Sequence, residues 1–246
     1  MKTVLIGLFS LSTAVVFSQA DLSKVTWVGK KNLIVNPGGE SISGNFPSSW
    51  KTDFPDSGES DFWSTYGVTS HEWSSNEKII GLPANAGNNY FRIMVNRTEE
   101  KRESNLYQII KIDDLLIQAN GAELTAVMSG NIAANYYSKG NCATVELKIS
   151  FLNSDDVVLD SLIVKKKSQE FRDLDEKSEL SIERGFSVMH EFIPVQESRV
   201  ISKGTKKIKV EMYCLFPCNW SQESEHEEDN FNVFFFDNLS LGVYKK

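Results

Sequence analysis

The chain has 246 residues, of which 41% are hydrophobic and 24% charged, and its formal net charge is −7. An acidic chain repels polyanions, so nucleic acid and anionic membrane surfaces are excluded as expected partners. The length suits a single large β domain, and 11% aromatic residues are enough to fill a packed core.

The first twenty residues have the pattern of a secretory signal peptide. Lys2 supplies a positive charge, a mostly apolar run covers 4–17, and Ser18 and Ala20 place small residues at positions −3 and −1 of a cleavage site. The run is too short for a stable membrane anchor, which makes a retained anchor the less favoured alternative. We therefore expect a secreted, extracellular protein in which residues 21–246 form one domain without membrane insertion.

Short runs of apolar and β-branched residues, bounded by turn-forming residues, recur along the rest of the chain and predict β-strands. A polar turn at 153–156 joins two of these runs as a hairpin. A brief helical turn is predicted within 113–117, before Asn120 and Gly121, and the charge-dense stretch 165–180 is interpreted as a solvated loop rather than a helix. The predicted strands are 90–95, 106–112, 122–130, 143–152, 157–164, 186–195, 206–214 and 232–243.

These strands lack any sustained helical period between them, and neither an internal repeat nor a linker divides the chain. Many short strands at regular spacing are typical of sandwiches and barrels. The predicted fold class is therefore all-β, an antiparallel β-sandwich in a single domain.

The stretch from 46 to 89 breaks this pattern, because it is rich in Ser, Gly, Asp and Pro and shows little alternation. A long irregular loop in a compact domain is usually functional. Its aromatic rings could stack on the apolar face of a sugar while nearby amides bind the hydroxyls, which indicates a glycan-contact surface. The alternative is that the rings pack into the core. The candidate contact residues are Trp63, Tyr66, Trp73, Asn89, Tyr136 and Tyr137, with Asn88, Asn131 and Asn135 as polar neighbours.

The three cysteines are an odd number for a chain sent to an oxidising compartment. In the predicted strand 206–214, Cys214 shares a face with Ile208 and Met212, which argues against a direct bridge to Cys142. Two pairings remain open, Cys214 with Cys218 or Cys142 with Cys218, and each leaves one thiol over. Three cysteines and three scattered histidines show no zinc-ligand spacing.

Three Asn-X-Ser/Thr sequons begin at Asn96, Asn219 and Asn238. They become glycosylation sites only in a eukaryotic source. A glycan on Asn238 would disrupt the last predicted strand, whereas Asn96 and Asn219 lie beside turns and are the candidate sites.

Catalytic motifs are missing from the sequence. There is no G-x-S-x-G or H-E-x-x-H pattern, and His71, His190 and His226 have no patterned partners. The acidic run 223–229 is interpreted as a solvated loop, with a weak cation patch as the sharper alternative. We therefore expect a protein that is not an enzyme.

Motifs at both ends of the chain carry a family resemblance. They are NLIVNPGGE at 32–40 with Trp50 after it, and FFDNLSL at 235–241; the GNNYF element at 87–91 and YQII at 107–110 lie between them. In order and spacing, they resemble the jelly-roll modules of the galactose-binding-like and carbohydrate-binding-module group. The resemblance implies a jelly-roll sandwich whose first and last strands lie together, a core role for Trp50 and a binding rather than catalytic function.

The resemblance also implies a structural calcium where the first and last strands meet, with Glu40 and Asp237 as ligands. Calcium prefers carboxylate and carbonyl oxygens. By strand alternation, Asp237 has the parity of Phe235 and Leu239, which predicts a side chain on the apolar face that needs a partner. The alternative is that Glu40 is an ordinary surface residue and Asp237 caps a turn.

Two functions remain after these steps. The favoured interpretation is a glycan-binding module with a structural calcium, and the alternative is a structural or adhesive extracellular protein that acts through protein contacts.

Overall fold

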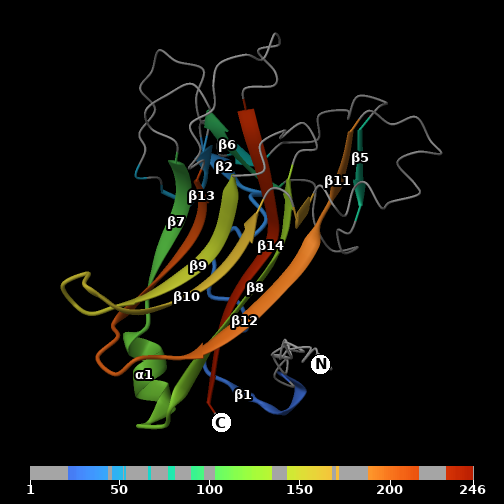
Figure 1. Cartoon of the computed structure of the whole chain (residues 1–246). Helices are drawn as coiled ribbons and strands as arrows, with labels where there is room; N and C mark the ends of the chain where they lie inside the picture. The colour runs from blue at the N-terminus through green and yellow to red at the C-terminus, as the bar shows by residue number, and fades with distance from the viewer. Residues whose placement is uncertain are drawn as a thin grey trace, which may run out of the picture.

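The computed structural model describes residues 22–43, 46–51, 53, 66–67, 77–80, 90–96, 103–134, 143–167, 170–171, 188–215 and 231–245. Two antiparallel sheets form the body of the protein, with one short helix at one end of them (Figure 1). Within the described ranges, no helix is long and apolar enough to cross a membrane.

The six-stranded sheet contains the last strand of the chain near its centre. Its order is β12-β8-β14-β6-β4, and β1 pairs with β14 as well. The bounds are β1 Thr26–Trp27, β4 Tyr66–Gly67, β6 Phe91–Asn96, β8 Leu124–Ala134, β12 Ile193–Val200 and β14 Phe231–Lys245.

The four-stranded sheet has the order β10-β9-β13-β7. Its bounds are β7 Glu103–Lys111, β9 Thr144–Leu152, β10 Val158–Lys167 and β13 Lys207–Leu215. The remaining elements are a 3-10 helix at Leu22–Lys24, α1 Asp113–Ala119, the antiparallel pair β2 Ile42–Ser43 and β3 Phe46–Pro47, and the parallel pair β5 Glu77–Ile80 and β11 Val188–Glu191.

The strand order is that of a jelly roll. Along the series β6, β7, β8, β9, β10, β12, β13 and β14, the chain changes sheet at every step except from β9 to β10, which form a hairpin within one sheet. The order β12-β8-β14-β6 therefore faces β10-β9-β13-β7, which is the double Greek-key pattern of jelly rolls. The predicted fold class and topology are confirmed.

The core lies between the sheets, and on β13 it is built by alternation of inward and outward residues. On β13, Ile208, Val210, Met212 and Cys214 are completely buried. Their shared face is the one that the sequence predicts.

Of the two cysteine pairings that the sequence leaves open, the one between Cys214 and Cys218 is not formed, because Cys214 is a free thiol held inside this core. Burial raises the pKa of the Cys214 thiol well above its ordinary value. Cys218, like Cys142, lies outside the described residues.

Some element boundaries differ from the prediction. The helical turn is confirmed as α1, which ends at Asn120 in the left-handed conformation (φ 50°). Strand β10 continues to Lys167 because its lysines pair along β9, so the stretch predicted as a loop from residue 165 begins as strand. The run predicted as one strand over 186–195 is interrupted at Phe192, which is buried between β11 and β12.

Residues 26–40, which we call the N-terminal strap, run along the half of β14 that β6 leaves free (Figure 1). The backbone N–H of Val28 donates to the carbonyl of Val243 at 2.8 Å, and that of Leu33 donates to Leu241 at 2.8 Å. The expectation that the first and last strands lie together is confirmed.

The strap is anchored where Trp27 packs on Gly242. A Cβ atom at Gly242 would lie 2.1 Å from the Trp27 ring, so only glycine allows the indole to lie this close to β14. Trp27 also meets Tyr244 edge to face, with ring centroids 6.0 Å apart.

Candidate functional site

The first candidate site is the corner where the end of the N-terminal strap meets β14. Glu40 and Asp237 both lie beside Gly38, since a Cβ at Gly38 would be 3.0 Å from Asp237 Oδ1 and 3.6 Å from Glu40 Oε1. Gly39 turns the backbone with φ 73°, which favours glycine. Leu239 N–H donates to the Pro37 carbonyl at 3.1 Å and fixes the strap above β14. The structure thus brings together the two carboxylates that the sequence nominates.

A β-bulge decides where Asp237 points. The pairing of β14 with β8 shifts between Asp237 and Ser240, so Phe236 and Leu239 both enter the core although two residues separate them. Asp237 therefore lies on the outer face of the six-stranded sheet, and the prediction that it shares a face with Leu239 is wrong because the bulge adds a residue.

Asp237 is nevertheless only 1% exposed. Its Oδ1 accepts a hydrogen bond from Asn238 N–H at 2.6 Å, whereas its Oδ2 is buried without a hydrogen-bond partner. Burial raises the pKa of Asp237 to about 6, with the charge of Glu40 adding to the rise and the Asn238 hydrogen bond opposing it. A bound cation would stabilise the ionised form of a buried carboxylate that lies beside a second carboxylate.

The donor set fits calcium in part. The two carboxylates, of which Asp237 has an oxygen without a hydrogen-bond partner, suit a hard cation that also accepts backbone carbonyls and water. Within the described ranges, no group of three or more His, Cys, Asp or Glu side chains is close enough to hold a metal ion. Glu40 and Asp237 are thus the acidic ligands that the corner could supply.

The second candidate site is a network on the outer face of the four-stranded sheet, which we call the polar face: Asp53, Asn105, Tyr107, Lys209 and Glu211. These residues come from β7, β13 and the segment beside β7, where Lys51 and Tyr107 exchange backbone hydrogen bonds of 2.8 and 2.9 Å. Register places Tyr107 opposite Glu211. Leu106 before Tyr107, and Val210 and Met212 on either side of Glu211, are buried in the core, so the side chains of Tyr107 and Glu211 point outward.

Asn105 lies at the centre of the polar face. Its Nδ2 donates to Glu211 Oε1 at 2.7 Å and to Asp53 Oδ2 at 2.9 Å, while its Oδ1 accepts from the Asp53 N–H at 3.0 Å. Lys209 Nζ donates to Glu211 Oε1 at 2.8 Å and lies 4.2 Å from the centre of the Tyr107 ring. Asn105 and Glu211 are 3% and 6% exposed, so the network is preorganised rather than free in solvent.

The ionisation of the polar face follows from these contacts. Burial opposes ionisation of Asp53, but the hydrogen bond from Asn105 and the charge of Lys209 lower its pKa. Burial likewise opposes the charge on Lys209, yet Glu211 and Asp53 raise its pKa. The pKa of Tyr107 is raised by burial and by its hydrogen bond to Asp53. At neutral pH the polar face therefore carries a carboxylate on Asp53, an ammonium on Lys209 and a neutral phenol on Tyr107.

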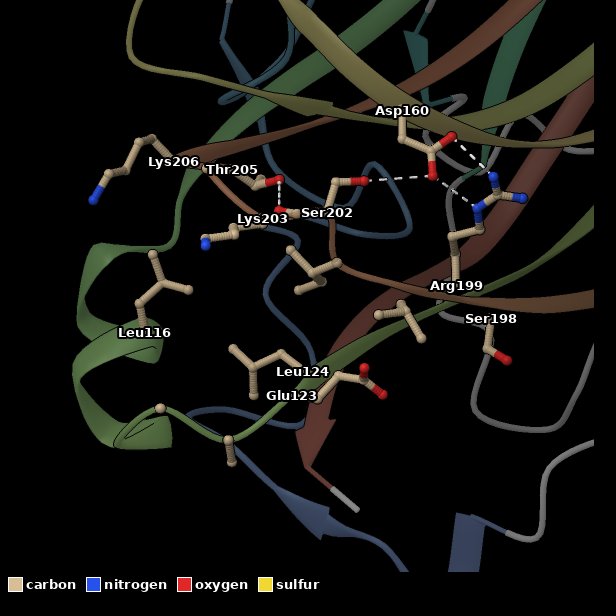
Figure 2. Close-up of a pocket in the computed structure, with 15 residues that line it drawn as sticks. Leu116, Glu123, Leu124, Asp160, Ser198, Arg199, Ser202, Lys203, Thr205 and Lys206 are labelled. Carbon is tan, nitrogen blue, oxygen red and sulfur yellow. Dashed lines mark hydrogen bonds and ion pairs between the residues drawn. The ribbon is translucent and has the colours of Figure 1, made fainter.

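A groove of about 940 Å³ opens at the α1 end of the sandwich (Figure 2). Arg199 donates from Nε and Nη2 to the two oxygens of Asp160, both at 2.9 Å, and ties β12 to β10 across it. Ser202 Oγ donates to Asp160 at 3.4 Å, and Thr205 Oγ1 donates to the Ser202 carbonyl at 2.6 Å. The polar side chains of Asp160, Arg199, Ser202 and Thr205 thus have hydrogen-bond partners within the protein, so their positions need no ligand to explain them.

Most residues of the predicted glycan surface lie outside the described residues. Tyr66 is described only as part of β4, where it pairs with Arg92. Asn96 ends β6 opposite Phe231, and Trp50 is buried against Phe91 as expected of a core residue. Outside the described ranges are residues 1–20, Trp63, Trp73, Asn88, Asn89, Asn135, Tyr136, Tyr137, Asn219, His71, His226 and the run 223–229.

Sequence reasoning missed the polar face. The signal was present: Asn105 and Tyr107 alternate with buried residues on β7, as do Lys209 and Glu211 with buried residues on β13. What the sequence did not indicate is that β7 and β13 are neighbours, which the jelly-roll order establishes.

Comparisons with known proteins find similarity only among solved structures. No family model matches it, and neither does any curated protein. Among solved structures, bacteriophage CBA120 tailspike protein 4 matches over 87% of this chain with 12% identity and a TM-score of 0.43, and this chain spans only 21% of that one.

Two smaller proteins are matched over most of their length. The CBM22-1 xylan-binding domain from Paenibacillus barcinonensis matches 82% of this chain and 90% of its own, with 8% identity and a TM-score of 0.39. The K2 cleaved adhesin domain of Lys-gingipain matches 85% of this chain and 96% of its own, with 14% identity and a TM-score of 0.39.

Proposed function

We propose that the protein is a secreted, non-catalytic module that binds a glycan on the polar face and a structural calcium at the Glu40–Asp237 corner. The observation that carries the proposal is the polar face itself. It presents the Asp53 carboxylate, the Lys209 ammonium and the Tyr107 ring on the sheet, and the buried Asn105 and Glu211 hold Asp53 and Lys209 by hydrogen bonds. The resemblance of the end motifs to those of carbohydrate-binding modules supports the same ligand class.

The chemistry of this face suits sugar hydroxyls. A hydroxyl donates one hydrogen bond and accepts others. The exposed Asp53 carboxylate and the part-exposed Lys209 ammonium supply both kinds of partner, while the buried Asn105 and Glu211 hold them in place. The Tyr107 ring adds an apolar surface for the C–H groups of a pyranose. Trp63, Tyr66, Trp73, Asn89, Tyr136 and Tyr137 stay predicted as further contacts.

Tyr107→Ala should weaken glycan binding at least tenfold, because a lost ring contact of about 1.4 kcal/mol changes the dissociation constant by that factor. A glycan array identifies the ligand, and titration calorimetry with that glycan then measures the dissociation constant. Ile117→Ala, at a 75% exposed position on α1, is the control that should leave binding unchanged.

Equal affinity of Tyr107→Ala and the unaltered protein would remove the polar face as the site. If a broad polysaccharide panel shows no binding and a protein partner co-purifies, the adhesive alternative replaces the glycan proposal. The exposed valines of β10 and the turn before it, Val157 and Val158, would then be the first surface to test.

The calcium proposal rests on the carboxylate corner. When bound, the ion would supply positive charge that neutralises Glu40 and Asp237 and joins the strap to β14. Calcium at a hundredfold excess over its dissociation constant should stabilise the fold by about 2.7 kcal/mol. For a domain of this size that corresponds to a rise in melting temperature of several degrees.

Thermal melts with calcium and with excess chelator measure this difference. Glu40→Gln should remove it, whereas Glu123→Gln, an exposed carboxylate at the start of β8, should preserve it. Identical melting curves with calcium and with chelator would show that the corner holds no calcium.

A further inference from the structure

A second polar hollow lies on the outer face of the six-stranded sheet, on the other side of the molecule from the polar face. Its volume is about 260 Å³. Strands β8, β12 and β14 form it at the bulge of β14. The residues that line it are Ser129, Gly130, Asn131, Pro194, Val195, Gln196 and Asn238.

Register explains why polar side chains gather there. Ser129 pairs with Gln196 across β8 and β12, and Asn131 pairs with Asp237 across β8 and β14. Met128 and Ile132 on the same strand β8 point into the core, so Ser129 and Asn131 point outward. Three amides and a hydroxyl therefore surround one small space.

The bulge gives the hollow its most unusual residue. Asn238 adopts the left-handed conformation with φ 49°, which is uncommon for a residue other than glycine. Its Nδ2 is buried and has no hydrogen-bond partner. A buried donor without a partner is costly in a native protein and calls for an explanation such as a bound group. Bulges commonly re-aim side chains at binding sites.

We propose that this hollow binds one neutral saccharide residue. An amide side chain both donates and accepts, so Asn131, Gln196 and Asn238 together can match several vicinal hydroxyls. None of the lining residues is charged, which favours a neutral ligand over a phosphate, a sulfate or a uronate. The inference shares the ligand class of the proposed function but uses a different surface.

A titration followed by NMR tests the hollow directly. Glucose, xylose, mannose and galactose are each added to ¹⁵N-labelled protein, and the side-chain amide signals of Asn131, Gln196 and Asn238 are followed. We expect at least one sugar to shift these signals with a dissociation constant in the millimolar range, as is reasonable for so small a ligand.

Gln196→Ala should abolish these shifts, because it removes one hydroxyl partner from a half-buried position that has no described hydrogen bond to lose. Tyr107→Ala should leave them unchanged, because Tyr107 belongs to the polar face. Shifts in the hollow without any polysaccharide binding would support this inference and count against the proposed function. Absence of shifts with all four sugars, or shifts that survive Gln196→Ala, would overturn the inference and leave the polar face to its own test.

Discussion

Phe91→Ala should lower the free energy of unfolding by about 3 to 5 kcal/mol, the usual cost of removing a large aromatic side chain from a core. Phe91 is completely buried at the start of β6. It pairs with Phe236 of β14, and its ring meets Trp50 edge to face with centroids 5.0 Å apart. The substitution therefore leaves a cavity where β6, β14 and the segment that holds Trp50 meet.

Urea unfolding followed by tryptophan fluorescence measures this loss, and Trp50 reports on the site itself. Ile163→Ala is the matched control, because Ile163 also lies in a strand but is 45% exposed, so its replacement should cost no more than about 0.5 kcal/mol. A loss below about 1 kcal/mol for Phe91→Ala would contradict the packing described here.

In the presence of excess chelator, the contribution of Asp237 to the stability of the fold should fall as the pH rises from 4 to 7. The pKa of Asp237 is raised from 3.8 to about 6 in the folded protein, mainly by burial. The folded state thus holds the proton more tightly than the unfolded state. The stabilisation that this proton gives to the folded state is complete below pH 3.8 and is lost as the pH rises through 6. The total loss is about 3 kcal/mol.

Asp237→Asn isolates this contribution from the other carboxylates. Asp53 and Asp160 have lowered pKa values, so their dependence on pH is opposite to that of Asp237. Their contributions to stability are lost as the pH falls. With chelator, the variant should match the unaltered protein near pH 4 and exceed its stability at pH 7. With calcium, the order at pH 7 should reverse. If the difference between the two proteins does not change with pH, Asp237 is ionised throughout.

Much of the fold follows from local sequence pattern. Alternation on 206–214 predicted the buried face of β13 and the inward position of Cys214, and the paired end motifs predicted that the strap lies along β14. The order of the strands could not be predicted from alternation, because it depends on pairings between residues far apart in the chain, such as those of β14 with β8.

The candidate sites also have features that follow from local sequence and features that depend on long-range strand pairing. Glu40 and Asp237 could be nominated from the motifs around them, but the orientation of Asp237 could not, because a bulge is an irregularity in pairing and leaves no period in the sequence. The polar face and the amide-lined hollow depend on which strands are neighbours. Of the residues that line the hollow, only Asn131 was predicted from the sequence as a polar neighbour of a glycan. The residues that lie beside it follow from the strand register.

The N-terminal strap also constrains the order of events during synthesis. Its partner is β14, the last strand of the sandwich, and the hydrogen bonds of Val28 to Val243 and Leu33 to Leu241 each span more than 200 residues. A ribosome releases the strap first and β14 last, so the strap must wait unpaired until nearly the whole domain has emerged. Such distant pairing slows folding and exposes an apolar segment to aggregation or chaperones in the meantime. In this protein, folding of the sandwich can therefore be completed only after β14 has been synthesised.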